Sequence, residues 1–321
     1  MKNKPILIVS GEPNSVFLEI FFKSINNKKY KSPLVLICSE RNLKQQMKKF
    51  KFKKGLNLLE INKIKIGKLD NKKINIINVD YQKSTNNNLN AKLKSKYIKE
   101  SFQKAFDLIR NGFTDKMING PINKKTFLNK KYLGITEYIS KNFNQKKIGM
   151  LIYNKSLSVC PLTTHLPLKL VSRKITKKLI EDKIQIINDF YKKIFKKRPK
   201  IAVTGLNPHC ESILRFNEDE KIVKLGIKSS IKKRINVKGP FPADTIFLKT
   251  NRKKFDVILG MYHDQVLPPL KTLFEFDAIN ITMGLPFLRV SPDHGPNQKM
   301  YGQNKSNPIS LIKALNFLDK K

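Results

Sequence analysis

Several residue types are scarce in this chain of 321 residues, and each scarcity excludes a class of protein. The three cysteines (Cys38, Cys160 and Cys210) are widely spaced and form no CxxC pair, so they provide no disulfide framework and favour a reducing cytoplasm. No apolar run approaches the roughly 18 residues that a membrane span requires. The short apolar run near the start leads to Gly11-Glu12-Pro13 rather than to a signal cleavage site. We therefore expect a cytoplasmic protein without a membrane partner.

Arginine is scarce as well, because only eight arginines accompany 57 lysines. The resulting net charge of +41 is typical of nucleic-acid binding, since protein cations release counterions from phosphates. Arginine, however, makes most of the specific phosphate and base contacts. The lysines are spread along the chain among many asparagines and isoleucines. A solvated lysine surface without a specific nucleic-acid partner is the preferred interpretation, and it could help to attract anionic substrates.

The fourteen glycines form none of the common nucleotide-binding or nucleophile motifs. The sequence contains no GxGxxG, no GxxxxGK[ST], no GxSxG and no kinase signature. If the chain binds a nucleotide cofactor, it does not hold it by the usual Rossmann loop.

Apolar runs of strand length alternate with helical patterns along the chain. The runs cover residues 6–9, 34–38, 74–79, 149–153, 201–204, 255–260 and 278–282. Continuous apolar runs are typical of strands that are buried on both faces of a mainly parallel sheet. Helical periodicity covers residues 91–110 and 175–197. The sequence therefore predicts an α/β fold with helices on both sheet faces, and its length favours two lobes with a cleft.

The histidines are the strongest chemical signal. The four of them (His165, His209, His263 and His294) each lie in a short segment rich in Gly, Pro, Asn or Asp. At least two of these segments directly follow a predicted strand, where the carboxyl ends of parallel strands form ligand clefts. Three imidazoles can hold a divalent transition metal and leave an open position for substrate. The alternative is that each histidine is an ordinary core or turn residue, since no local motif such as HExxH is present.

Charged and polar residues near these turns extend the candidate site. Asp264 directly follows His263 and could orient that ligand or accept a proton. Asp244 could do similar chemistry, or it could simply cap a helix. Further along, Lys271, Asn280 and Arg289 are spaced nine residues apart and would form an anion site if they converge.

A set of short segments occurs in one order along nearly the whole chain. They are residues 11–13 (Gly-Glu-Pro), 119–124 (Asn-Gly-Pro-Ile-Asn-Lys), 136–137 (Thr-Glu), 164–168 (Thr-His-Leu-Pro-Leu), 205–209 (Gly-Leu-Asn-Pro-His), 239–245 (Gly-Pro-Phe-Pro-Ala-Asp-Thr), 261–265 (Met-Tyr-His-Asp-Gln) and 280–289 (Asn-Ile-Thr-Met-Gly-Leu-Pro-Phe-Leu-Arg). Together they resemble the 4-hydroxythreonine-4-phosphate dehydrogenase family, whose enzymes make a precursor of pyridoxal phosphate.

The resemblance implies two α/β/α lobes like those of isocitrate and isopropylmalate dehydrogenases, and a homodimer with its sites at the interface. We expect one lobe to comprise residues 1–125 with 285–321, and the other residues 126–284. The resemblance also implies a divalent metal (Zn, Mg or Co) held by His165, His209 and His263 from both subunits.

Further site residues follow from the same resemblance. Thr136, Lys271, Asn280 and Arg289 match the family's substrate-binding positions. His294 and Gly295 lie in a segment where family members contact the dinucleotide, and they are the candidate cofactor-binding residues. Independently of the resemblance, Asp244 and Asp264 are the candidate catalytic groups.

The implied reaction is an oxidation followed by a decarboxylation. NAD or NADP takes hydride from C3 of 4-phosphooxy-L-threonine, a phosphorylated hydroxy-amino acid. The resulting 2-amino-3-oxo-4-phosphooxybutanoate loses carbon dioxide and gives 3-amino-2-oxopropyl phosphate. A metal acting as Lewis acid would acidify the hydroxyl, polarise the ketone and stabilise the enolate that decarboxylation leaves.

The chain departs from the family pattern at four places. Ile135 replaces the histidine of the family's Gly-His-Thr-Glu, and residues 14–18 replace Ala-Gly-Ile-Gly-Pro. Pro296 and Asn297 replace Thr-Ala after Gly295, and residues 302–306 replace a Gly-Lys-Gly-like stretch. The last two lie where family members contact the dinucleotide. Two alternatives therefore stay open: oxidation of another small phosphorylated hydroxy acid, and a basic binding protein on a catalytically dead fold.

Overall fold

The computed structural model describes residues 3–26, 28–123, 127–128, 132, 134–213, 215–292 and 295–321. The chain divides into two compact units, unit 1 (Met1–Ile139 with Pro286–Lys321) and unit 2 (Ser140–Leu285). The first junction lies inside helix α5 (Ile135–Asn142), later than the expected boundary after residue 125. The reason is that Phe127 and Tyr138 pack against Phe102 of unit 1, so this stretch belongs to that core.

Unit 1 is built on a parallel sheet. Its strands lie in the order β3-β4-β2-β1-β5-β12, and each strand runs parallel to its neighbours. The strands are β1 (Ile6–Val9), β2 (Leu34–Cys38), β3 (Leu56–Leu58), β4 (Ile74–Asn78), β5 (Lys116–Asn119) and β12 (Leu288–Pro292). The unit also contains α1 (Phe17–Ile25), α2 (Glu40–Lys49), α3 (Asn87–Arg110), α12 (Ile309–Asp319) and short 3-10 helices at Ile61–Lys63, Ile66–Lys68 and Gln298–Met300.

Unit 2 has a mixed sheet with the strand order β11-β6-β7-β10-β8-β9. Neighbours among β7, β10, β8 and β9 pair in parallel, whereas β6 runs antiparallel to both β7 and β11. The strands are β6 (Gly149–Tyr153), β7 (Ser158–Thr163), β8 (Ile201–Thr204), β9 (Val237–Phe241), β10 (Val257–Tyr262) and β11 (Ile279–Met283). The helices include α6 (Val171–Lys174), α7 (Lys177–Phe195), α8 (Lys224–Lys232), α9 (Ala243–Ile246), α10 (Lys249–Arg252) and α11 (His263–Phe274).

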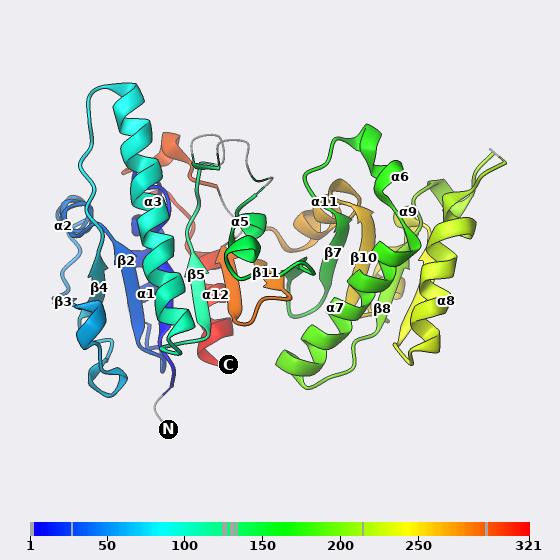
Figure 1. Cartoon of the computed structure of the whole chain (residues 1–321), viewed down its shortest axis with the longest axis horizontal. Coiled ribbons are helices and arrows are strands. Elements are labelled where there is room, and N and C mark those ends of the chain that lie inside the picture. Colours follow the sequence, from blue (N-terminus) through cyan, green and yellow to red (C-terminus); the bar gives the residue numbers. More distant parts are fainter. Residues whose placement is uncertain are drawn as a thin grey trace. The chain divides into compact units, whose positions relative to one another are not determined.

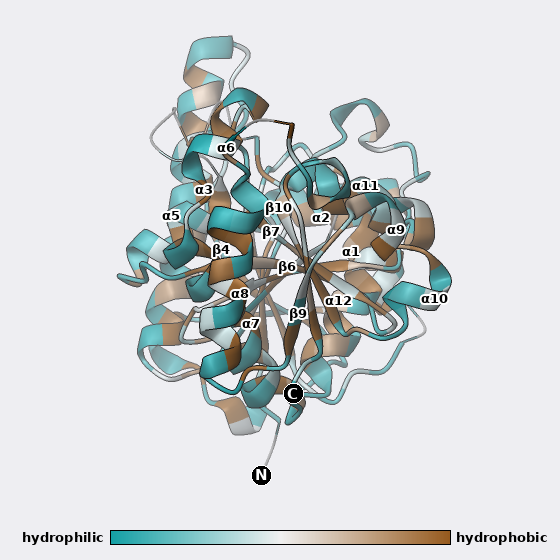
Figure 2. Cartoon of the chain, turned by 90° about the vertical axis from the view of Figure 1, so that its right-hand side faces the viewer, coloured by the Kyte–Doolittle hydropathy of each residue, from teal (hydrophilic) through white to brown (hydrophobic). Residues whose placement is uncertain are grey.

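Burial explains why these segments form strands and helices. The residues of β1 are fully buried, because the strand lies inside its sheet and helices α3 and α12 contact it (Figure 1). In unit 2, α7 packs on β6 and β7. Figure 2 shows hydrophobic colours on many strands and hydrophilic colours on much of the helices and loops. Side chains set the helix starts, since the Asn86 carboxamide oxygen accepts hydrogen bonds from the first turn of α3 and the Thr176 hydroxyl oxygen accepts one from that of α7.

The architecture confirms the predicted α/β class. Each of the seven predicted apolar runs contains or overlaps an observed strand (β1, β2, β4, β6, β8, β10 and β11), and the two helical patterns correspond to α3 and α7. In the part of the chain that is described, no helix is both long enough and apolar enough to cross a membrane.

Candidate active site

Four neighbouring strand ends in unit 2 carry the predicted catalytic and metal-binding residues. Strands β7, β10, β8 and β9 are adjacent and parallel, so their carboxyl ends lie at one edge of the sheet. His165 lies just after β7, His263 directly follows β10, and His209 lies in the turn after β8. Asp244 follows β9 in the same way. The carboxyl edge of a parallel sheet is the usual place for a ligand site in such folds.

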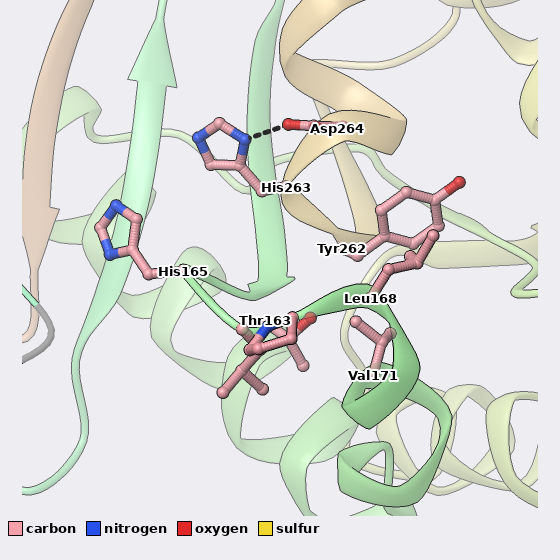
Figure 3. Close-up of a pocket in the computed structure, with 9 residues that line it drawn as sticks. Thr163, His165, Leu168, Val171, Tyr262, His263 and Asp264 are labelled. Carbon is pink, nitrogen blue, oxygen red and sulfur yellow. Dashed lines mark hydrogen bonds and ion pairs between the residues drawn. The ribbon is translucent and has the colours of Figure 1, made fainter.

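His165 and His263 are brought together at this edge. Their ring centroids are 6.1 Å apart, and the rings are tilted by 36°. Both line a cavity of about 450 Å³ together with Thr163, Leu166, Pro167, Leu168, Val171, Tyr262 and Asp264. Figure 3 shows the two imidazoles on one side of this cavity and Leu168, Val171 and Tyr262 on the other. The cavity therefore combines a polar, nitrogen-rich side with an apolar side.

Asp264 orients the imidazole of His263. The Asp264 carboxylate lies 2.5 Å from Nδ1 of His263, and its own side chain is 78% exposed. Because Nδ1 is engaged, Nε2 is the ring nitrogen left for a ligand, which is the arrangement found for many metal-binding histidines. Of the two roles considered for Asp264, this geometry favours ligand orientation.

The backbone is strained at two of the three predicted metal ligands. His165 has φ of 53° and His209 has φ of 55°, both in the left-handed region, as is Cys210 at 62°. Few non-glycine residues adopt this region, and they are concentrated at sites where the surrounding structure imposes the conformation. The surrounding structure therefore holds the turns after β7 and β8 in a defined conformation.

The donor set fits a divalent transition metal. Within the described residues, no group of three or more His, Cys, Asp or Glu side chains is placed to hold an ion, so His209 does not join the pair in one chain. His209 is exposed on a 3-10 turn (Pro208–Cys210). The pair of imidazoles, one of them oriented by a carboxylate, suits zinc or cobalt better than magnesium, which prefers oxygen ligands. The pair comprises two of the three residues that the sequence predicts as ligands.

Asp244 does not cap its helix, so that interpretation is wrong. The N-cap position of α9 is occupied by Pro242, and no side-chain capping bond is formed there. Asp244 instead lies exposed in the first turn.

Cys210, next to His209, has a raised pKa. Burial is the largest cause, followed by the charge of Asp219 and, with a smaller effect, that of Asp244, and the pKa rises to about 11. The Cys210 thiol is therefore protonated near neutral pH.

In unit 1 the structure brings together Arg289 and Thr136. Arg289 lies on β12 with only 1% of its surface exposed. Its Nε donates to Oδ1 of Asn119 at 2.7 Å, and its Nη1 donates to the Thr136 hydroxyl at 3.4 Å. Burial lowers the pKa of the guanidinium to about 10, and the Glu137 carboxylate opposes this decrease. Arg289 is therefore charged at neutral pH and held in a fixed orientation.

Sequence reasoning missed Asn119 as a site residue. It ends strand β5 and is 3% exposed, and its side-chain oxygen accepts the hydrogen bond from Arg289 on the neighbouring strand β12. A signal was present, because an asparagine followed by Gly120 and Pro121 at the end of a strand is typical of a ligand-binding turn.

Two further predicted substrate contacts belong to unit 2. Lys271 is half-buried near the end of α11. Asn280 lies on β11, and its buried Oδ1 has no hydrogen-bond partner among the described residues. Because buried polar atoms are almost always paired, this oxygen is available to accept a hydrogen bond from a bound donor.

The predicted cofactor-binding residues lie just after β12. His294 lies outside the described residues. Gly295 is exposed, and a side chain there would meet no atom within 4 Å, so ligand could approach its backbone. The Val16 N–H donates to the Pro296 carbonyl at 3.2 Å, which ties this segment to the start of α1. The backbone of Gly295 is therefore open to a ligand.

Comparisons with known proteins identify the family and the fold of this chain. The model of the family described as pyridoxal phosphate biosynthetic protein PdxA matches residues 29–318. The chain is 33% identical over 316 residues to 4-hydroxythreonine-4-phosphate dehydrogenase of Sulfurihydrogenibium sp., covering 97% of this chain and 96% of that one. It is 34% identical over 212 residues, 65% of each chain, to D-threonate 4-phosphate dehydrogenase of Pectobacterium atrosepticum. The crystal structure of 4-hydroxythreonine-4-phosphate dehydrogenase from Klebsiella pneumoniae has a TM-score of 0.83 at 26% identity and covers 98% of both chains.

Proposed function

Because the chain belongs to the pyridoxal phosphate biosynthetic protein PdxA family, we propose that it is a metal-dependent, NAD(P)-linked dehydrogenase of 4-phosphooxy-L-threonine. Oxidation at C3 would be followed by loss of carbon dioxide, giving 3-amino-2-oxopropyl phosphate in the route to pyridoxal phosphate. The observation that carries this proposal is the His165–His263 pair at the carboxyl edge of the sheet, inside a cavity of about 450 Å³.

His165, His209 and His263 are the proposed metal ligands. The chain would work as a homodimer in which both copies contribute ligands, and this is consistent with the absence of a three-ligand group from the described part of a single chain. A bound divalent ion would act as a Lewis acid toward the substrate hydroxyl and then toward the ketone. Asp264 keeps the His263 ring in one orientation, so that Nε2 faces the ligand position.

The remaining side chains would bind the substrate and move its proton. In unit 1, Arg289 is a proposed contact of an anionic group of the substrate, and the Thr136 hydroxyl lies beside its guanidinium. In unit 2, Lys271 is likewise a proposed contact of the substrate's phosphate or carboxylate. The unpaired Oδ1 of Asn280 accepts a hydrogen bond from a substrate hydroxyl or ammonium. Asp244, exposed at the same edge as the histidines, accepts the proton of the C3 hydroxyl.

The nicotinamide cofactor, NAD or NADP, would accept the C3 hydride. Gly295 is a proposed contact, because the open space there lets a ligand approach the backbone. His294 stays a proposed contact from the sequence alone. Residues 296–306 differ from the family pattern, yet Lys23 Nζ binds the carbonyls of Asn304 and Ser306 at 2.9 and 3.0 Å. The altered segment is therefore anchored to helix α1.

The test is a substrate panel with both cofactors, with and without a chelator. We expect reduction of NAD or NADP with 4-phosphooxy-L-threonine, and loss of that activity when the metal is removed. Reduction that continues in excess chelator contradicts the metal-dependent mechanism. No reduction with any phosphorylated hydroxy acid contradicts the enzymatic function.

A second candidate substrate is D-threonate 4-phosphate. Two observations favour it: the relative from Pectobacterium atrosepticum carries that name, and Ile135 stands where the family has a substrate-contacting histidine. A lost polar contact changes which substrate a pocket prefers. The same panel separates the two candidates by their specificity constants.

Arg289→Lys is expected to raise the Michaelis constant for the phosphorylated substrate about 10-fold or more. Lysine cannot reproduce a bidentate guanidinium contact, and one lost charged hydrogen bond is worth about 1.5–3 kcal/mol. Steady-state kinetics with Arg110→Lys, at an exposed position on α3, provide the matched control. An unchanged Michaelis constant would show that Arg289 is structural.

The lysine-rich surface is expected to bind DNA or RNA weakly, and the binding should vanish near physiological salt. Non-specific binding depends on counterion release and therefore falls steeply with ionic strength. Fluorescence anisotropy with labelled oligonucleotides across a salt series measures this directly. Sequence-selective, submicromolar binding at physiological salt would instead favour the basic binding protein on a catalytically dead fold.

A further inference from the structure

Gln265, in the first turn of α11, joins the end of strand β10 to the end of strand β8. Its side chain is buried, with 8% of its surface exposed. Oε1 accepts hydrogen bonds from the Met261 N–H and from the Thr204 hydroxyl, both at 2.7 Å. Nε2 donates to the Gly205 carbonyl, also at 2.7 Å. One amide group therefore fixes both strand ends.

The hydrogen bonds between the ends of β10 and β8 require a side-chain amide that reaches both strands. A carboxamide has a carbonyl oxygen with two acceptor positions and an amino group that donates, and Gln265 uses both groups here. Gly260 of β10 makes the approach possible, because a side chain there would collide with Val266 and lie 3.2 Å from the Gln265 oxygen. Burial of the amide in this place is therefore a specific arrangement rather than a loose surface contact.

Asp219 holds the same turn from the other side. It is fully buried at the start of a π-helix (Asp219–Val223), and its carboxylate accepts three hydrogen bonds. The donors are the Leu206 N–H at 2.6 Å, the Asn207 N–H at 3.0 Å and the Asn207 side-chain amide at 3.1 Å. A side chain at Gly205 would lie 3.0 Å from the carboxylate and 2.6 Å from the Cys210 sulfur. Hydrogen bonds from both sides therefore hold the turn after β8, and we call this turn (residues 205–207) the clamped turn.

These contacts surround a turn whose final residues have unfavourable backbone angles. His209 has φ of 55° and Cys210 has φ of 62°, and the His209 side chain is exposed. Such angles persist when neighbouring structure holds them. The position of the His209 imidazole therefore depends on the clamped turn that precedes it.

We propose that Gln265 and Asp219 are positioning residues for the metal site. Gln265 fixes the strand ends that carry His263 and His209, and Asp219 fixes the turn that presents His209. The proposal rests on the proposed function, because it assumes that both histidines are metal ligands. Groups that support ligands from the outer shell typically change metal affinity by roughly 10- to 100-fold when they are replaced.

The test is metal affinity, measured on the full chain without turnover. Gln265→Met keeps a side chain of similar length and removes all three hydrogen bonds, whereas Asp219→Asn keeps the shape and removes the carboxylate charge. Asp189→Asn is the matched control, because Asp189 is an exposed carboxylate on α7 in the same unit. Co²⁺ binding is followed by its visible absorption and Zn²⁺ binding by calorimetry, with circular dichroism to verify the fold.

We expect the dissociation constant for Co²⁺ to rise roughly 10- to 100-fold in Gln265→Met and in Asp219→Asn, and to stay unchanged in Asp189→Asn. Folded variants that bind Co²⁺ as tightly as the unmodified chain overturn the positioning role alone. An unmodified chain that binds neither Co²⁺ nor Zn²⁺ overturns the proposed metal site, and this inference with it. If either variant does not fold, Thr204→Val is used instead, because it removes the hydrogen bond from the Thr204 hydroxyl to Gln265. An unchanged dissociation constant for Co²⁺ in that variant overturns the proposal.

Discussion

Alanine at His263 is expected to abolish turnover, or to raise the metal requirement greatly, while the protein stays folded. The imidazole is one of two that face each other 6.1 Å apart, so its loss removes half of the donor pair in unit 2. The loss of activity should exceed the roughly 10- to 100-fold loss that is typical when a residue that only hydrogen-bonds to a metal ligand is replaced. Because the His263 side chain is 38% exposed, its removal leaves no large cavity in the core.

His165→Ala and His209→Ala should have the same effect, because both residues are proposed ligands of the same ion. Asp264→Asn is the graded comparison, since it keeps the His263 ring and weakens only the group that orients it. Activity is measured across a metal titration, and thermal unfolding shows whether each variant is folded. Full activity of the three alanine variants in excess chelator would contradict metal dependence through these histidines.

The sequence predicted the strands that consist of continuous apolar residues and missed those that polar or proline residues interrupt. Strand β5 begins with Lys116, and β12 contains Arg289. Both are buried, because Lys116 Nζ lies 3.3 Å from the Ser32 hydroxyl and Arg289 binds Asn119. Pro161 interrupts β7 in the same way. A buried charge that has partners is compatible with a strand, but its partners lie far away in the sequence and a local pattern does not contain them.

The grouping of the histidines could be predicted only in part. For His209 and His263 the sequence predicted a preceding strand, which placed them at the carboxyl edge of a sheet. His165 follows β7, a strand that the sequence did not predict. Which of them meet depends on strand order, and β10 lies between β7 and β8 although it comes after both in the chain. This crossover places His263 beside His165. The hydrogen bonds of Gln265 also depend on this strand order, and those of Asp219 depend on a buried turn. Neither role could therefore be predicted from the spacing of residues in the sequence.

Ile135→His is expected to raise the specificity constant for 4-phosphooxy-L-threonine, by up to the roughly 10²–10⁴-fold that a positioned acid–base group contributes. Ile135 is half-buried at the start of α5, directly before Thr136, whose hydroxyl accepts from Arg289. An imidazole there could donate a hydrogen bond or a proton to substrate, whereas isoleucine can do neither and excludes water. Because Thr136 and Glu137 remain, we favour the same reaction at lower efficiency in the present chain.

The alternative is that the pocket has adapted to a ligand with less polarity at this point. In that case Ile135→His leaves 4-phosphooxy-L-threonine unreactive and impairs another substrate, for which D-threonate 4-phosphate is the first choice. The surrounding side chains could also have repacked around isoleucine and resist a polar insertion, which costs stability. A thermal unfolding curve distinguishes that outcome from a change of specificity.

The decisive measurement is steady-state kinetics of the parent chain and Ile135→His on one substrate panel, with both cofactors and saturating metal. Lys141→His is the matched control, because it adds an imidazole to an exposed position of the same helix. A gain that is confined to Ile135→His and to 4-phosphooxy-L-threonine supports the favoured interpretation. If that variant is folded, binds metal and is no better than the parent on this substrate, the loss of the family histidine reflects a different substrate rather than a weakened form of the same enzyme.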